Sequence, residues 1–260
     1  MYALITPVIL TFNEAPNIAR TLERLSWARE VVVVDSFSSD ETVEIALRFP
    51  NVRLTQRRFD THAQQWNFAI RDTGITTPWV LALDADYLLT AGLLEELRTL
   101  DPKQEVSGYR ARFVYCIEGQ ALRGTVYTPV TVLYRRELAE YKQDGHTQRV
   151  LLTGTIGELR NPILHDDRKP LESWLLAQQR YMRLEAEKLR HAVSDRLNWP
   201  DRLRRMRVVA PFVMLVYCLI VKLAILDGRA GWFYAFQRFV AESILSLYLL
   251  RGDVLGNKDG

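Results

Sequence analysis

The sequence has few cysteines, no large charge excess and no signal for export. Cys116 and Cys218 are its only thiols and stand in unrelated contexts, so neither a disulfide framework nor a zinc knuckle is supported, and a reducing compartment fits best. The formal net charge is only +3, and no segment interleaves aromatic and basic residues as nucleic-acid modules do. Residues 1–10 lack the basic lead-in and the cleavage site of a secretory signal. Nucleic acid is therefore not an expected partner.

The composition is that of a globular protein with one substantial core. Hydrophobic residues make up 48% and charged residues 25% of the 260 positions. These fractions exclude a disordered chain, and the length suits one principal domain with an appendage.

Residues 3–102 alternate between strand-like and helix-like patterns. Strands are predicted at 4–11, 31–34, 51–55 and 79–83, and helices at 15–25, 40–49 and 61–73. Strands separated by helices imply right-handed crossovers and a parallel sheet, which binds its ligands outside the carboxyl ends of the strands. The predicted fold class is therefore α/β.

An apolar run ends abruptly in Asp84-Ala85-Asp86 after the fourth predicted strand. Two acids separated by one residue share a face of an extended chain, and at a strand end they reach past the core. Hard cations such as Mg²⁺ or Mn²⁺ prefer such oxygen ligands, often together with substrate phosphates. A turn that merely ends the strand is the alternative.

Polar residues also follow the other predicted strands. Asp35 ends a run of four valines, where an acid is costly unless it meets a donor such as a ribose hydroxyl or a base amide. Asn13 and Glu14 follow the first strand, where they either bind a ligand or cap the next helix. Ser38, Ser39 and Asp40 suit an ordinary capped loop.

Three ordered motifs resemble the family 2 glycosyltransferases of the GT-A fold. The motifs are Ile9-Leu10-Thr11-Phe12-Asn13-Glu14, Val31-Val32-Val33-Val34-Asp35-Ser36 with Asp40 and Thr42, and Leu83-Asp84-Ala85-Asp86. The resemblance implies an enzyme that binds a nucleotide-diphospho-sugar, with Mg²⁺ or Mn²⁺ on the diphosphate. It also implies roles for particular residues. The resemblance implies substrate contacts for Thr11, Glu14, Asp35 and Asp84, and metal contacts for Asp86 and His165. From their own positions in the sequence, Asn13 and Arg168 are further candidates for substrate binding, and Asp84 is a further candidate metal ligand.

The second half of the chain looks like the lipopolysaccharide-core glucosyltransferase branch of that family. The segments that carry this likeness are 108–111, 131–136 and 226–231. That branch often shows His-Glu where this chain reads Asp144-Gly145-His146-Thr147-Gln148, and Gln148 accepts no proton. Asp144 and His146 are therefore the candidates for the general base, unless the segment is only a turn. Tyr87 stands where relatives often place Glu.

His165 opens a polar segment after another apolar run. A late histidine completes the metal shell in several GT-A enzymes, although an isolated His is more often a hydrogen-bonded structural residue. Arg168 and Lys169 follow it and would close over the diphosphate if this segment is a lid.

Residues 171–260 turn helical in composition. Four arginines at 202, 204, 205 and 207 precede an uncharged stretch at 208–221, which is shorter than the ~20 residues of a spanning helix. After a predicted turn at 227–229, residues 232–250 are apolar but carry Arg238, Glu242 and Ser246 at helical spacing. This polar stripe favours a helix that lies on the membrane, with the arginines at anionic headgroups, over a spanning hairpin or a dimer interface.

The predicted protein is thus a metal-dependent inverting glycosyltransferase with a GT-A domain at 1–170, divided into a donor half (1–102) and an acceptor half (103–170), and a membrane-associating helical region at 171–260. Its expected partners are a nucleotide-diphospho-sugar, a lipid-linked or cell-envelope glycan acceptor and the cytoplasmic face of the inner membrane, where it would be peripheral or monotopic. Two alternatives are a catalytically silent membrane scaffold and a haloacid-dehalogenase-type phosphohydrolase, whose Asp-x-Asp usually follows the first strand rather than the fourth.

Overall fold

The computed structural model describes residues 1–144, 147–191 and 199–256, which form two compact units. The sheet unit comprises Met1–Gly119 and Tyr127–Lys169, and the helical unit comprises Gln120–Val126 and Pro170–Gly260. The segment Gln120–Val126 thus belongs to the helical unit, although its sequence position lies inside the predicted first domain.

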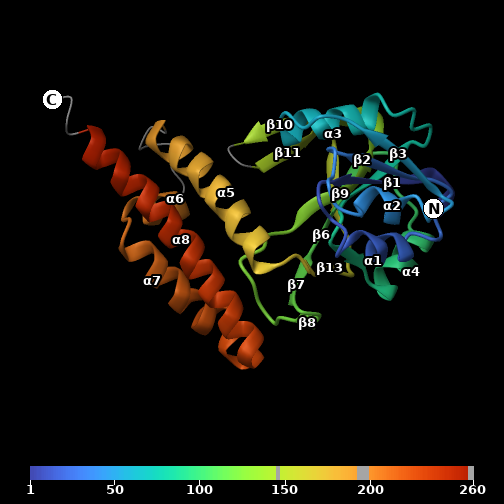
Figure 1. Cartoon of the computed structure of the whole chain (residues 1–260). Coiled ribbons are helices and arrows are strands. Elements are labelled where there is room, and N and C mark those ends of the chain that lie inside the picture. Colours follow the sequence, from blue (N-terminus) through green and yellow to red (C-terminus); the bar gives the residue numbers. More distant parts are fainter. Residues whose placement is uncertain (145–146, 192–198, 257–260) are drawn as a thin grey trace. The chain divides into compact units, whose positions relative to one another are not determined.

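A seven-stranded sheet forms the centre of the sheet unit (Figure 1). The strands lie in the order β12-β6-β9-β4-β1-β2-β3, and all of them except β9 run in the same direction. The prediction of a mostly parallel sheet is confirmed. The bounds are β1 Ile5–Thr11, β2 Val31–Asp35, β3 Val52–Gln56, β4 Trp79–Asp84, β6 Val106–Ala111, β9 Val130–Arg135 and β12 Thr155–Glu158.

Alternate residues of the central strands pack on opposite faces of this sheet. Ile9 and Val33 face one apolar cluster together with residues of α1, α2 and α4, whereas Val8 and Val32 face a second cluster together with α3. Both faces are covered, which is why the valine run of β2 is buried throughout instead of alternating with polar residues. The helices of this unit are α1 Ile18–Glu23, α2 Thr42–Ala46, α3 His62–Arg71 and α4 Ala91–Thr99, with 3₁₀ turns at Tyr2–Leu4 and Arg136–Leu138.

The predicted helices at 15–25 and 40–49 are both shorter in the structure. Residues 15–17 form a turn before α1. Asp40 is not the N-cap of α2, because its carboxylate bonds the backbone N–H groups of both Thr42 and Ala15 and so joins two loops. By contrast, Thr61 is the N-cap of α3, and its side chain accepts the backbone N–H of Gln64.

Two smaller groups of strands complete the sheet unit. β13 (Ile163–His165) pairs in parallel with β7 (Phe113–Ile117) and antiparallel with β5 (Tyr87–Leu89), so His165 lies opposite Tyr87 in register. β10 (Ala139–Asp144) and β11 (Thr147–Leu152) form an antiparallel pair. The pairing of β13 with β5 brings residue 165 beside the loop that follows β4.

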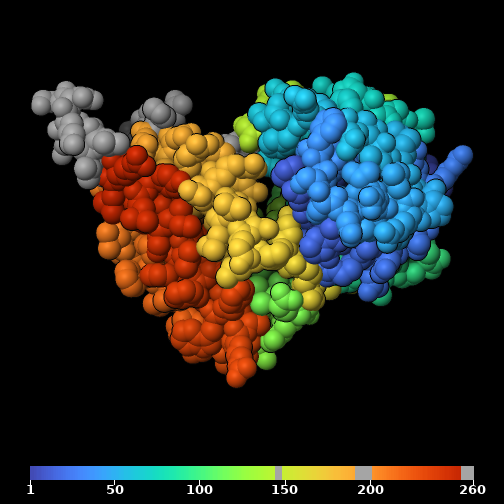
Figure 2. Space-filling model, viewed as in Figure 1, coloured from blue at the N-terminus to red at the C-terminus, as the bar shows by residue number. Residues whose placement is uncertain are grey.

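The helical unit packs three long helical segments along one another (Figure 1 and Figure 2). Helix α8 contacts both α5 and α7. The bounds in this unit are α5 Leu171–His191, α6 Trp199–Arg205, α7 Val209–Val216, a π-helical turn at Tyr217–Val221, a 3₁₀ turn at Ala224–Asp227, α8 Gly228–Gly256 and the short strand β8 Gln120–Ala121.

The polar stripe of α8 faces the interior of the helical unit. Glu242 and Ser246 are only 5% and 6% exposed. Glu242 pairs with Arg204 at 2.9 Å, and Arg238 lies over the ring of Trp174. Helical spacing reports that residues share a face but not what that face contacts. The expectation that this region lies on a membrane therefore stays a prediction.

The connection between α7 and α8 also differs from its prediction. The backbone reverses at Leu223, which adopts a positive φ of 58°, and α8 already begins at Gly228. Gly231 allows the close approach of the two segments, because a Cβ there would lie 1.7 Å from the carbonyl oxygen of Ala224. Among the described residues, no single helix meets the length and hydropathy of a membrane span, although Val209–Val221 and Ala224–Gly252, bent by 69°, meet them together.

Candidate functional site

Three strands of the sheet unit deliver polar side chains to one edge of the sheet. Thr11 at the end of β1 lies opposite Asp35 at the end of β2, and Leu10 lies opposite Asp84 at the end of β4. This register follows from the parallel pairing, and it places the residues at the carboxyl edge, as predicted from the sequence.

Asp35 is the centre of a hydrogen-bond cluster between the first two strands. Its side chain is completely buried and accepts hydrogen bonds from the Thr11 hydroxyl (3.0 Å), from the backbone N–H and hydroxyl of Ser38, and from the Gln56 amide (3.0 Å). Burying an acid after a run of valines is costly, and these donors of the protein itself offset that cost. The predicted nucleoside contacts of Thr11 and Asp35 stay predictions.

Asn13 holds the loops after β1 and β2 together. It adopts a positive φ of 53°, and its side-chain oxygen accepts the backbone N–H of Ser39 at 2.8 Å. Its own N–H donates to the Ser38 hydroxyl at 2.9 Å. The structure thus gives Asn13, Ser38 and Ser39 a role in shaping the loop, in line with the capped-loop interpretation for the two serines.

Asp84 and Asp86 occupy different environments although one residue separates them. Asp84 keeps an exposed surface, but protein surrounds it closely, and this desolvation together with the charge of Asp86 raises the pKa of Asp84 to about 6. Asp86 is more enclosed and its Oδ2 lies 3.0 Å from Nε2 of His165. Burial opposes ionisation of Asp86, but the paired His165 holds the pKa of Asp86 below its usual range. Asp86 is therefore held as a carboxylate at neutral pH.

The doublet offers a site that suits a cation. Oδ1 of Asp86 is buried and has no hydrogen-bond partner, and a buried carboxylate oxygen without a donor is costly unless a positive charge meets it. Among the described residues, no three His, Cys, Asp or Glu side chains converge as a ready-made metal site. The donor set of Asp84 and Asp86 nevertheless fits a hard cation that takes its other ligands from phosphate or water.

His165 is enclosed by tyrosine rings. The rings of Tyr87, Tyr115 and Tyr127 approach it edge-on at centroid distances of 5.2, 4.8 and 5.0 Å. The hydroxyl of Tyr127 lies 2.9 Å from that of Tyr87, and Tyr87 in turn hydrogen-bonds Asp84. Burial lowers the pKa of His165, but the charge of Asp86 outweighs this effect and the net shift is upward. The tyrosines thus orient both acids, Asp84 directly and Asp86 through His165.

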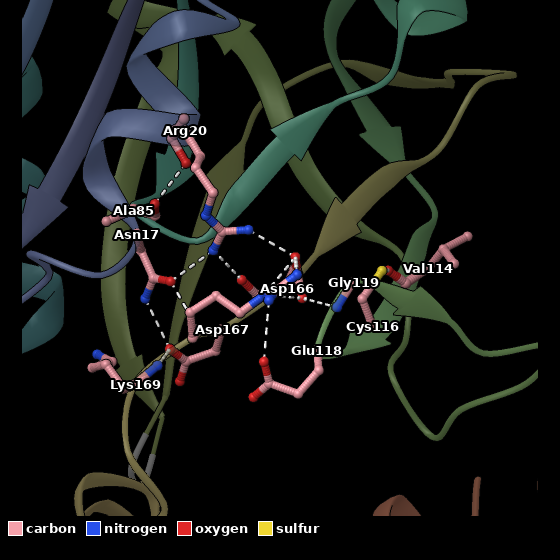
Figure 3. A network of polar contacts seen from close by, with 12 residues as sticks. Asn17, Arg20, Ala85, Val114, Cys116, Glu118, Gly119, Asp166, Asp167 and Lys169 are labelled. Carbon is pink, nitrogen blue, oxygen red and sulfur yellow. Dashed lines mark hydrogen bonds and ion pairs between the residues drawn. The ribbon is translucent and has the colours of Figure 1, made fainter. Parts of the chain in front are cut away.

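A dense polar network fixes the segment that follows β13 (Figure 3). Arg20 of α1 donates to the carboxylate and the carbonyl of Asp166, both at 2.7 Å. Asn17 is completely buried and bonds both Glu14 and Asp167 through its amide nitrogen. The network ties the loop after β1 to the loop after β13 around the acidic doublet.

Lys169 and Arg168 have different surroundings. Lys169 Nζ lies 2.5 Å from Oε1 of Glu14, and its charge acts on both Asp84 and Asp86. Arg168, which we predicted to bind substrate, instead bonds the Asp166 carboxylate and Glu118. Lys169 is therefore the basic residue beside the doublet, and the structure gives Arg168 a role in holding the loop.

The predicted general bases cannot be compared with this geometry. Asp144 ends β10, but its side chain and all of His146 lie outside the described residues. Their assignment stays a prediction.

Sequence reasoning missed Asn17, Arg20 and the hydrogen-bonded pair Tyr87 and Tyr127. Tyr87 was noted only as a departure from the family pattern, and that departure was the available signal. Asn17 and Arg20 look like ordinary surface residues of a helix in the sequence, and only the return of residues 166–169 to α1 gives them partners.

Comparisons with known proteins show the family of this chain. The model of the glycosyl transferase family 2 matches residues 6–156, so the chain belongs to that family and is a glycosyltransferase. The lipopolysaccharide core biosynthesis glycosyltransferase LpsC of Rhizobium meliloti (strain 1021) is 28% identical over 195 residues, which cover 69% of each chain. An uncharacterized glycosyltransferase of Rickettsia bellii (strain RML369-C) is 29% identical over 143 residues, 53% of this chain and 48% of that protein.

The fold is also similar to that of a solved crystal structure. The crystal structure of S. aureus TarS 1-349 in complex with UDP-GlcNAc superimposes with a TM-score of 0.50 at 16% identity, and covers 92% of this chain and 81% of that one. The predicted GT-A-like architecture and the resemblance to the lipopolysaccharide-core branch are confirmed. The family match also decides against the phosphohydrolase alternative.

Proposed function

We propose that this glycosyltransferase uses a nucleotide-diphospho-sugar and transfers the sugar, with inversion and with the help of a divalent cation, to a hydroxyl of a lipid-linked or cell-envelope glycan. The observation that carries the proposal is the acidic doublet at the carboxyl edge of the sheet, with its bare Asp86 oxygen and with Lys169 alongside. LpsC, whose name describes lipopolysaccharide core biosynthesis, and TarS, solved with UDP-GlcNAc, support the choice of donor and acceptor class.

Asp84 and Asp86 would hold Mg²⁺ or Mn²⁺, with His165 as a third candidate. The cation would neutralise the negative charge that grows on the departing nucleoside diphosphate. His165 already contacts Asp86, so its direct role in this site is to orient that carboxylate. Lys169 is placed to attract the diphosphate through its charge.

The chain must also supply a base opposite the leaving group. In an inverting transfer the acceptor oxygen attacks the anomeric carbon, the bond to the diphosphate breaks, and the acceptor proton passes to the base. Asp144 and His146 remain our candidates for this role. Glu14 and Asp35 are less suitable, because Glu14 is paired with Lys169 and Asp35 with four donors of the protein.

We further propose that the enzyme works at the cytoplasmic face of the inner membrane as a peripheral or monotopic protein. The basis is chemical: an acceptor sugar built on a lipid is confined to a membrane surface, so an enzyme held there meets it more often. The exposed apolar side chains of the helical unit support this location.

The test is a thermal-shift panel of UDP, GDP and dTDP with and without Mn²⁺. A ligand that binds only the folded state at a hundredfold excess over its Kd adds about 2.7 kcal/mol to the free energy of unfolding. We expect one nucleotide to raise the Tm, and Mn²⁺ to enlarge that shift. Asp86→Asn should abolish the Mn²⁺-dependent part.

Asp101→Asn is the matched control, because Asp101 is an exposed acid of the same unit away from the doublet. It should shift with nucleotide and Mn²⁺ as the unmodified protein does. If no nucleotide raises the Tm and no nucleotide-sugar is hydrolysed or transferred, the proposal fails and the scaffold interpretation gains its support.

A further inference from the structure

The helical unit has an unusual distribution of polarity, with acids and amides inside and large apolar side chains outside. Glu185, Asp227 and Gln237 are 3%, 7% and 8% exposed, whereas Phe212 and Phe236 are 58% and 59% exposed. Protein surfaces in water rarely carry a contiguous group of such side chains unless a partner covers it. The unit also has an ordinary apolar core, with Met182, Leu189 and Leu245 among its buried residues, so the exposed apolar side chains are additional to that core and do not replace it.

The exposed apolar side chains line one face of each of two adjacent segments. Phe212, Val216 and Ile220 stand four residues apart along α7 and the π-helical turn. On α8, Phe236 stands four residues after Trp232 and three after Phe233. Phe239 joins the two rows, because its ring lies 5.3 Å from that of Phe212 and 5.7 Å from that of Phe236. We call these six exposed residues the apolar face.

The charges around this face have one sign. Between residues 202 and 241 the only acid is Asp227, which is buried and bonded to Arg123. The same stretch contains seven basic residues: Arg202, Arg204, Arg205, Arg207, Lys222, Arg229 and Arg238. Arg229 is exposed and lies on α8 one turn before Trp232, so at least one positive charge adjoins the apolar face.

This charge pattern selects among possible occupants of the face. A symmetric contact between two copies would bring the same basic stretch close to itself, with no exposed acid in 202–241 to neutralise it. Phosphates of an anionic bilayer complement that charge, and acyl chains accept the aromatic and aliphatic side chains. The geometry is also suitable for an element that enters one leaflet, because Val209–Val221 and Ala224–Gly252 meet at a 69° bend and do not form one straight span.

From these observations we infer that the apolar face inserts into the headgroup and acyl boundary of an anionic membrane leaflet, with the α7–α8 bend as the inserted element. This inference rests on the membrane location in the proposed function, and deepens it by naming the surface that enters the lipid. The polar stripe of Arg238, Glu242 and Ser246 holds the helices together and does not meet the headgroups.

The test is co-sedimentation of the full-length chain with sucrose-loaded vesicles. Vesicles of phosphatidylcholine with about a quarter of phosphatidylglycerol should bind the chain, and pure phosphatidylcholine vesicles should bind it roughly tenfold more weakly. The double variant Phe212→Asp, Phe236→Asp should lose binding roughly tenfold or more. Both side chains are exposed, so the far-UV circular dichroism and the Tm should stay unchanged.

Leu47→Asp provides the matched control. Leu47 is 60% exposed, similar to Phe236, but lies in the sheet unit after α2. This variant should bind vesicles like the unmodified chain. If it loses binding as the double variant does, general surface hydrophobicity is responsible and the inference is overturned.

A second readout locates the inserted element directly. Trp232 is 51% exposed on the apolar face, whereas Trp66 and Trp79 are buried in the sheet unit. Lipids with brominated acyl chains should quench part of the tryptophan fluorescence, and Trp232→Phe should remove most of that quenching. Undiminished quenching in this variant would contradict insertion at the bend.

Two further outcomes have definite meanings. If the unmodified chain does not bind anionic vesicles and sediments as a dimer that the double variant converts to a monomer, a second copy covers the apolar face and the inference is wrong.

Hydrolysis of the soluble nucleotide-sugar does not need the membrane. Retained hydrolysis without vesicle binding therefore overturns only this inference, and vesicle binding without nucleotide binding overturns only the proposed function.

Discussion

The two units of the chain place their charged residues in opposite ways. In the sheet unit the core is apolar and the acidic doublet lies at one edge of the sheet, where Asp84 stays exposed and Oδ1 of Asp86 has no hydrogen-bond partner. In the helical unit, Glu185 and Glu242 lie inside around Arg204, and phenylalanines lie outside. A cluster of charges thus keeps one oxygen without a hydrogen-bond partner in the sheet unit, whereas in the helical unit a cluster of charges holds helices together. What distinguishes them is whether the protein itself supplies all of the partners.

The strongest test of this contrast removes the charge of Asp86, whose Oδ1 has no hydrogen-bond partner. Asp86→Asn should lower the transfer rate by roughly a hundredfold or more, because the carboxylate that would hold the cation is lost. Its Tm without ligand should change little, since the loss of the ion pair with His165 and the relief of the repulsion with Asp84 oppose each other. Steady-state kinetics at saturating Mn²⁺ and a thermal melt give both readings. A fall in Tm with unchanged rate would mean that the doublet is structural.

The complementary change removes the charge that is fully partnered. Arg204→Met leaves Glu185 and Glu242, whose side chains are 3% and 7% exposed, without their common cation. We expect a loss of about 3 kcal/mol in the free energy of unfolding, measured by urea denaturation.

The companion variant for Arg204 neutralises all three groups. Arg204→Met combined with Glu185→Gln and Glu242→Gln should recover a large part of the lost stability, because no buried charge then lacks a partner. If the triple variant is as unstable as the single one, packing of the Arg204 side chain matters more than its charge.

Tyr127→Phe tests how far the site depends on orientation. The change removes the hydroxyl that bonds Tyr87 and leaves the ring against His165. We expect roughly a fivefold weaker Mn²⁺ dependence of nucleotide binding, because one neutral hydrogen bond is worth about 1 kcal/mol. Titration calorimetry measures it, and Tyr2→Phe, which removes a hydroxyl bonded to the Leu94 carbonyl, should show no such effect.

The smallest expected effect concerns a carboxylate of the sheet unit away from the site. Glu96 accepts the backbone N–H groups of Arg160 and Asn161. Burial opposes ionisation, but these hydrogen bonds hold the pKa of Glu96 below 4.5. A lowered pKa stabilises the folded state above pH 4.5, and this stabilisation disappears as the pH falls through the folded-state pKa.

Glu96→Gln should therefore cost about 1 kcal/mol at pH 7 and progressively less in acid, measured by urea unfolding at several pH values. A cost that does not change with pH would assign the effect to lost packing.

Local sequence patterns were sufficient to predict the edge of the sheet. The valine run of β2 and the apolar run before Asp84 each act within a few residues, and parallel pairing then brings the strand ends together. The doublet could be found because its two acids are neighbours in the chain.

Features that depend on distant contacts could not be predicted. Lys169 rather than Arg168 stands beside the doublet because Asp166 and Glu118 engage Arg168, and nothing in the spacing of 168 and 169 says which of them is engaged. The stripe on α8 has the same period whether it faces lipid or protein, and the partner Arg204 is 38 residues away. The segment Gln120–Val126 belongs to the helical unit through bonds to Asp227 and Tyr234, which no local pattern reveals.

The most direct test of the central claim is an anomalous diffraction map from crystals grown with UDP and Mn²⁺. The account predicts a manganese peak within bonding distance of Asp84 and Asp86, with the diphosphate on its other side and Lys169 close by. A peak at another place, or a nucleotide bound away from the ends of β1, β2 and β4, would contradict it.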